Sequence, residues 1–210
     1  MFGILAFGDS IVFGRGNNID RGWAGRMRKY FEAKDYYNGF YNLGIPGNST
    51  ADLLERIDTE CKARIKINRQ EDKFVVLIGI GINDSRLIGK LDNPQVKEDD
   101  FKNNILKLIK ISKKYTEHVV FIGLTPVDES KTKPYEETYF LNERIEKFNE
   151  IIKESCAKNK ILFVDMLDEI KNKKINFAKL LDDGLHPNAK GYEEMHKIIK
   201  KFLIENKLIS

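Results

Sequence analysis

The chain has 210 residues and a mass of 24.3 kDa, the length of about one globular domain, and we expect a single domain over residues 1–210. Hydrophobic residues make up 41% and charged residues 32%, a composition that excludes disorder throughout the chain. The 36 Lys and Arg residues against 32 Asp and Glu leave a net charge of +4, too small to favour nucleic acid as a partner.

Cysteine and histidine are scarce. The chain has two cysteines and three histidines, which argues against a disulfide framework and against a Cys/His zinc cage. Cys61 and Cys156 continue apolar helical stripes, so we expect buried thiols. Any catalytic histidine must be one of His118, His186 and His196.

The amino-terminal segment begins with an apolar run and turns polar at Gly8 and Asp9, without the basic region of a signal peptide. We expect a first strand there. No run approaches the ~20 apolar residues that cross a bilayer, so we expect no membrane span and a cytoplasmic location. The pattern does not indicate an oligomeric state.

Short apolar runs alternate with segments of helical period along the chain. Five runs predict buried strands: Ile4–Phe7, Phe40–Ile45, Phe74–Ile80, Val119–Leu124 and Ile161–Val164. Apolar stripes between and after them predict amphipathic helices: Leu53, Ile57, Cys61, Ile65; Phe101, Ile105, Leu108, Ile109; Leu141, Ile145, Phe148, Ile152; and Met195, Ile199, Phe202, Leu203. Trp23, before the apolar face of the first helix, is predicted to lie in the core.

Strict alternation of strand and helix predicts an α/β fold of three α/β/α layers, a doubly wound parallel sheet with helices on both faces. Ligands bind such sheets beyond the carboxyl ends of the strands. Polar residues follow each of the first four predicted strands: Gly8-Asp9-Ser10, Pro46-Gly47-Asn48-Ser49, Gly81-Ile82-Asn83-Asp84 and Thr125-Pro126. We therefore expect a site at this rim of the sheet.

Two long stretches, residues 85–100 and 125–138, carry no helical or strand period. Loops of this length in a compact domain are often lids or substrate-facing walls. Surface insertions are also thermodynamically cheap, so both interpretations stay open.

The end of the chain places Asp183 three residues before His186, in a Gly- and Pro-rich segment that cannot be helical. A constrained turn there can bring the carboxylate onto the imidazole. A serine becomes nucleophilic when a base accepts its proton and a carboxylate orients that base. Ser10, His186 and Asp183 can supply these three roles, although Ser10 taken alone is better explained as a helix-capping residue.

Acyl transfer also needs donors for the oxyanion. Candidates at the rim are the backbone N–H groups of Ser10 and Gly47 and the side-chain amide of Asn83. Taken singly, Gly47 is better explained as a turn residue, and Asn83 as the cap of a turn. Their joint occurrence after successive strands, together with the terminal Asp-x-x-His, favours the catalytic interpretation.

Four blocks together resemble the SGNH, or GDSL-type, hydrolase superfamily: Gly8-Asp9-Ser10, Asn42-Leu43-Gly44-Ile45-Pro46-Gly47, Gly81-Ile82-Asn83-Asp84 and Asp183-Gly184-Leu185-His186-Pro187. The resemblance implies a flavodoxin-like five-stranded sheet without metal or organic cofactor. It implies Ser10 as nucleophile, His186 as general base with Asp183 as its partner, and Ser10, Gly47 and Asn83 as the oxyanion hole. Ile11 stands where the family's GDSL motif has leucine, a conservative change.

The prediction is therefore a serine esterase that hydrolyses a small carboxylic ester, with a short acyl chain or an acetylated carbohydrate. An acyltransferase and a non-catalytic binding module on the same fold stay open as alternatives. A metal-dependent phosphoryl-transfer enzyme is a further alternative, in which Asp9 and Asp84 would hold Mg²⁺, although structural roles suit both aspartates better. His118 and His196 are expected to be structural.

Overall fold

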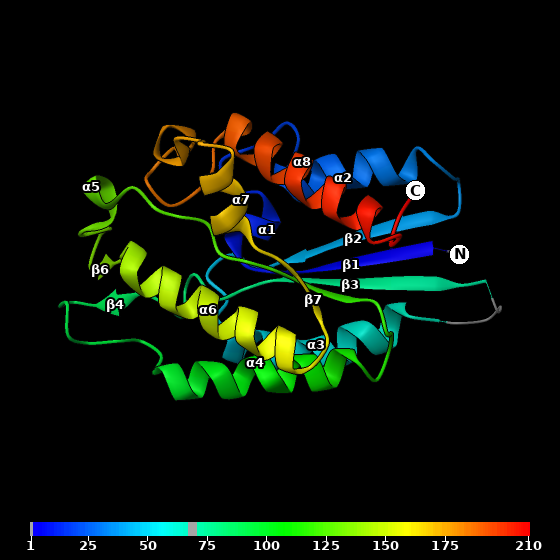
Figure 1. Cartoon of the computed structure of the whole chain (residues 1–210), viewed down its shortest axis with the longest axis horizontal. Coiled ribbons are helices and arrows are strands. Elements are labelled where there is room, and N and C mark those ends of the chain that lie inside the picture. The colour runs from blue at the N-terminus through cyan, green and yellow to red at the C-terminus, as the bar shows by residue number, and fades with distance from the viewer. Residues whose placement is uncertain (1, 67–70) are drawn as a thin grey trace.

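In the computed structural model, which describes residues 2–66 and 71–210, a five-stranded parallel sheet lies between two layers of helices (Figure 1). Its strands are β1 (Phe2–Gly8), β2 (Asn38–Gly44), β3 (Lys73–Gly79), β5 (Val119–Ile122) and β7 (Leu162–Val164). Each corresponds to one predicted apolar run. The α/β/α prediction is confirmed, with strand ends that differ by at most two residues.

The strand order is β2-β1-β3-β5-β7, and every neighbouring pair is parallel. The chain starts in the middle at β1, moves out to β2, and then crosses back past β1 to β3. This is the flavodoxin-like order, whose reversal point between β1 and β3 is the usual place for a ligand site. The segments that follow β1 and β3 are those that contain Ser10 and Asn83.

Helices α2 (Gly22–Glu32), α7 (Met166–Asn172) and α8 (Ala189–Glu205) cover one face of the sheet. Helices α3 (Thr50–Arg64), α4 (Glu98–Ser112) and α6 (Asn142–Lys158) cover the other (Figure 1). Within residues 2–66 and 71–210, no helix is both long enough and apolar enough to span a membrane. The described residues also form three shorter helical segments: α1 (Ser10–Phe13), α5 (Glu129–Thr132) and the 3₁₀ helix Phe177–Leu180.

The predicted apolar stripes form the core between sheet and helices. Trp23 is 1% exposed, as predicted. Cys61 and Cys156 are free and buried, and burial raises the pKa of each thiol to about 12, so both act as small hydrophobic residues. Three stripe residues are only partly buried: Ile65 and Leu141, which fall at helix ends, and Phe202 on α8.

Glycines at the carboxyl ends of the central strands let α1 sit close to the sheet. Gly44 and Gly79 are the neighbours of Gly8 in the sheet register. A Cβ on Gly8 would lie 2.2 Å from the carbonyl oxygen of Gly79, and a Cβ on Gly44 would lie 2.3 Å from the backbone nitrogen of Phe13. Larger residues would push the serine turn away from the sheet.

The two long stretches at the rim are partly ordered against each other, which the sequence did not predict. Strand β4 (Leu87–Ile88) pairs antiparallel with β6 (Thr138–Tyr139), beyond the carboxyl ends of the main strands (Figure 1). Arg144 on α6 donates from Nε to the carbonyl of Ser85 at 2.8 Å and from Nη2 to that of Val96 at 3.2 Å. These two bonds hold the segment that contains β4 against helix α6.

Candidate active site

Ser10 is the first residue of α1, directly after β1. The Asp9 side chain caps this helix by accepting the N–H of Ile11 at 2.8 Å. Ser10 is 5% exposed. The backbone N–H of Ser10, in the first turn of α1, has no partner within the helix, so this position combines a hydroxyl with a backbone donor.

The turn that carries His186 is built by Asp183. Its Oδ1 accepts the backbone N–H of Leu185 at 2.9 Å and that of His186 at 2.7 Å. Gly184 adopts a φ of 91°, which favours glycine, and the Asp182 N–H donates to the His186 carbonyl at 2.9 Å. These bonds fix the imidazole and the carboxylate relative to each other.

Ser10, His186 and Asp183 lie in a continuous chain of hydrogen bonds. His186 Nε2 is 2.9 Å from Ser10 Oγ, and His186 Nδ1 is 2.7 Å from Asp183 Oδ2. Burial raises the pKa of Asp183, but the hydrogen bonds from His186 and Leu185 outweigh it and hold the pKa well below its usual range. An ionised Asp183 favours the tautomer with the proton on Nδ1, which leaves Nε2 to accept from the serine hydroxyl.

Gly47 lies in a tight turn after β2. The turn is closed by the Asn48 N–H, which donates to the Ile45 carbonyl at 3.1 Å, with Pro46 and Gly47 between them. Gly47 has a φ of 83°, and an added Cβ would meet no atom within 4 Å. Gly47 therefore does serve as a turn residue, and there is open space beside its Cα.

The rim loops are hydrogen-bonded to one another. The Ile45 N–H donates to the Gly8 carbonyl at 3.0 Å, and Asn83 Nδ2 donates to the Asn48 carbonyl at 3.0 Å. Arg56 on α3 also links them, from Nη2 to the Gly8 carbonyl at 3.2 Å and from Nε to Asn48 Oδ1 at 3.0 Å. Sequence analysis missed Arg56, because an arginine on an amphipathic helix carries no signal that distinguishes a rim contact from solvent.

Asp9 and Asp84 both accept hydrogen bonds at helix N-termini. Asp84 accepts the backbone N–H of Thr50, the first residue of α3, at 3.0 Å, and also the Thr50 hydroxyl. Burial raises the pKa of Asp9 to about 7 and that of Asp84 to about 6. The contacts match the structural roles expected for the pair.

The other two histidines lie away from this cluster. His118 directly precedes β5, at the opposite end of the sheet, and His196 lies on α8, where burial lowers its pKa to about 4. Tyr135, which sequence analysis missed, does reach the cluster: its hydroxyl donates to Asp183 Oδ2 at 2.9 Å. It belongs to a loop without periodicity, so no pattern singled it out.

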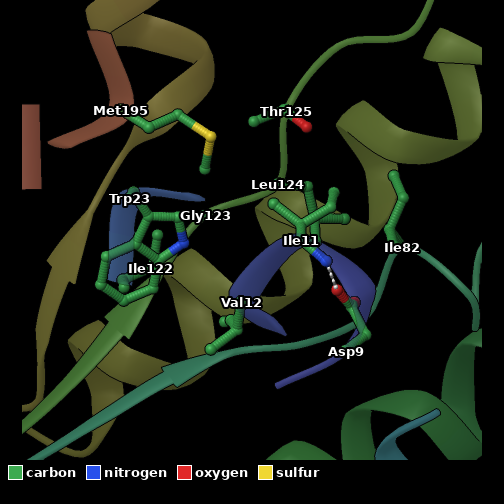
Figure 2. A pocket seen from close by; sticks show the side chains of 11 residues that line it. Asp9, Ile11, Val12, Trp23, Ile82, Ile122, Gly123, Leu124, Thr125 and Met195 are labelled. Atoms are coloured by element: carbon green, nitrogen blue, oxygen red, sulfur yellow. Dashed lines mark hydrogen bonds between the residues drawn. The ribbon is translucent and has the colours of Figure 1, made fainter. Parts of the chain in front are cut away.

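A small cavity lies beside α1 and beneath the rim (Figure 2). Its volume of about 20 Å³ is about the room of one water molecule. Most of its lining is apolar and includes Ile11, Val12, Ile82, Leu124 and Met195. Thr125 also lines it, with a buried hydroxyl that has no hydrogen-bond partner in the described part of the chain.

Solved structures share this fold. A lipase/acylhydrolase from Enterococcus faecalis has a TM-score of 0.75 and 22% identity, over 97% of this chain and 95% of that one. An acetylxylan esterase from Geobacillus stearothermophilus has a TM-score of 0.74 and 19% identity, over 96% and 93%. An alpha/beta hydrolase enzyme from the metagenome of Lake Arreo, Spain, has a TM-score of 0.74 and 15% identity, over 95% and 94%.

Sequence comparison agrees with the fold. No curated protein matches the chain. The sequence model of the GDSL-like lipase/acylhydrolase family matches residues 6–194, which include all four blocks on which the resemblance rested. The chain therefore belongs to the GDSL-like lipase/acylhydrolase family.

Proposed function

We propose that the protein is a serine esterase that cleaves a small carboxylic ester through an acyl-enzyme intermediate. The observation that carries the proposal is the chain of hydrogen bonds from Ser10 Oγ to His186 Nε2 and from His186 Nδ1 to Asp183 Oδ2, at 2.9 and 2.7 Å. It supports Ser10 as nucleophile, His186 as general base and Asp183 as the group that orients the base.

In the first half-reaction, Ser10 Oγ attacks the ester carbonyl carbon while its proton passes to His186 Nε2. Asp183 stabilises the resulting imidazolium through Nδ1. When the tetrahedral intermediate collapses, the carbon–oxygen bond to the alcohol breaks and His186 returns the proton to the leaving alkoxide. In the second half-reaction, water attacks the acyl-serine with His186 again as base, which releases the carboxylic acid and restores Ser10.

Three groups are proposed to bind the oxyanion: the backbone N–H of Ser10, the backbone N–H of Gly47 and the amide of Asn83. The amide has two N–H donors, and one of them is bound to the Asn48 carbonyl at 3.0 Å. That bond fixes the orientation of the amide so that its second N–H can serve the oxyanion. Donors held in place before the reaction supply most of the electrostatic stabilisation in acyl transfer.

The substrate class that fits is a short acyl chain, including the acetyl group of a modified carbohydrate. One structural neighbour is an acetylxylan esterase, and two of its variants, one with an aspartate and one with a serine replaced by alanine, are described as catalytic mutants. This neighbour supports the roles given to Ser10 and Asp183 here.

The test is a hydrolysis profile over p-nitrophenyl esters of increasing chain length and one acetylated xylo-oligosaccharide. Ser10→Ala should abolish turnover with an unchanged unfolding midpoint. Ser112→Ala is the matched control, because Ser112 is buried on α4 with a hydroxyl that has no partner among the described residues. Turnover retained by Ser10→Ala would refute the proposal.

A fluorophosphonate probe separates the alternatives. Labelling of the wild type but not of Ser10→Ala, without hydrolysis and with transfer to an added alcohol, would identify an acyltransferase. No labelling at all would identify a binding module. Hydrolysis of a phosphate ester that is lost on chelation and unaffected by Ser10→Ala would instead favour the phosphoryl-transfer enzyme.

A further inference from the structure

Tyr135 is held in the rim segment by its own turn. Its N–H donates to the Thr138 carbonyl at 2.7 Å, and its carbonyl accepts the Thr138 N–H at 3.0 Å. The ring packs edge-to-face on buried Phe140, with centroids 6.0 Å apart. The phenol is therefore placed by contacts independent of the hydroxyl.

That hydroxyl reaches the carboxylate at the end of the proposed triad. It donates to Asp183 Oδ2 at 2.9 Å, the same oxygen that lies 2.7 Å from His186 Nδ1. The other oxygen, Oδ1, accepts the two backbone N–H groups within its own turn. Among the described residues, Tyr135 is thus the donor to the Asp183 side chain that comes from a distant part of the chain, 48 residues away.

We propose that Tyr135 is a positioning residue for the triad. Its hydroxyl holds Asp183 Oδ2 against His186 Nδ1 and, by donating to that oxygen, reduces the negative charge that Oδ2 presents to the imidazolium. The inference rests on the proposed esterase function. Burial and then the hydrogen bond to Asp183 raise the pKa of Tyr135 to about 12, so the phenol is a donor throughout the working pH range. The segment that carries β6 is thereby linked to the reacting groups.

Removing this hydroxyl has two consequences. Oδ2 loses a fixed partner, so the imidazole is aligned less often with Ser10 and kcat falls. Oδ2 also keeps more negative charge, which favours the protonated imidazole, so the base becomes free only at higher pH. The other titratable and charged groups near this point are Arg15, Asp182, Glu136, Lys131, Tyr192 and Asp9, whose pKa of about 7 lies within the assayed range. All of them are the same in wild type and variant, so only the difference between the two pH profiles reports on Tyr135.

The experiment compares Tyr135→Phe with Tyr139→Phe, a half-buried tyrosine on β6 without a hydrogen bond to Asp183 among the described contacts. Hydrolysis of p-nitrophenyl acetate and the rate of fluorophosphonate labelling are measured from pH 5 to 9. We expect Tyr135→Phe to lower kcat and the labelling rate about 10-fold with little change in KM, the effect of losing one hydrogen bond to a charged group. The acidic limb of kcat/KM should move up by about half a pH unit. Tyr139→Phe should match the wild type.

Two outcomes would overturn the positioning role. One is a Tyr135→Phe variant whose kcat and pH profile match those of Tyr139→Phe. The other is a loss of activity accompanied by a lower melting temperature, with no movement of the acidic limb. That result would indicate that Tyr135 acts by packing alone. Ser10→Ala, assayed in parallel, separates the two proposals: activity in Ser10→Ala refutes the esterase itself, whereas a silent Tyr135→Phe beside an inactive Ser10→Ala refutes only this inference.

Discussion

The buried carboxyl of Asp9 should give the protein a pH-dependent stability that a single substitution removes. Asp9 is 2% exposed, and burial together with the nearby Asp84 raises its pKa from an ordinary 3.8 to about 7. Asp9→Asn keeps a side-chain oxygen for the Ile11 N–H, which Asp9 accepts at 2.8 Å, and asparagine is an equally good helix N-cap. The substitution therefore removes the titration and keeps the cap.

The sign follows from the direction of the shift. Between pH 3.8 and about 7 the folded protein retains a proton on Asp9 that the unfolded chain has released, so this group makes folding less favourable as pH rises. From pH 5 to pH 8 the contribution amounts to a loss of about 3 kcal/mol. His196, with its lowered pKa, acts in the opposite direction, but it is present in both proteins and cancels in the comparison.

The assay is urea unfolding of wild type and Asp9→Asn at pH 5 and pH 8. The free energy of unfolding of the variant relative to wild type should rise by about 3 kcal/mol between these pH values, a relative midpoint shift of about 1 M urea. Asp92→Asn, on an exposed aspartate, is the matched control and should follow the wild-type curve. A difference between Asp9→Asn and wild type that is the same at both pH values would refute the reasoning.

Three further predictions concern the site and its support. Asp183→Asn should lower kcat about 10⁴-fold, because the amide favours the wrong tautomer of His186, and an activity near that of wild type would contradict the assigned role. Asn83→Ala should lower kcat about 10²-fold with little change in KM, measured beside its unfolding midpoint to separate catalysis from loop support. Gly8→Ala should destabilise the fold by about 3 kcal/mol, because its Cβ would lie 2.2 Å from a neighbouring backbone oxygen. Gly39→Ala, whose Cβ would make an ordinary 3.6 Å contact, is its control in a urea melt.

Features that depend on residues close together in the sequence were predictable from it. Buried parallel strands are continuous apolar runs, and helices show a 3.6-residue period, so five strands and the main helices could be located. The contact between Asp183 and His186 was also predictable, because the two residues are three positions apart in one constrained turn. The pairing of β4 with β6 was not predictable, because strands of two residues show no periodicity.

The sequence by itself therefore determined the fold class, the family and the short blocks that contain the candidate site residues, because these features depend on the spacing of residues close together in the chain. Only the tertiary structure decided which blocks meet. Ser10 and His186 are 176 residues apart, and their 2.9 Å contact depends on how α1 and the turn before α8 pack over the central strands. The contacts of Arg56 and Tyr135 likewise join segments that are distant in the chain. Such contacts produce no periodic pattern in the sequence, so only the structure shows them.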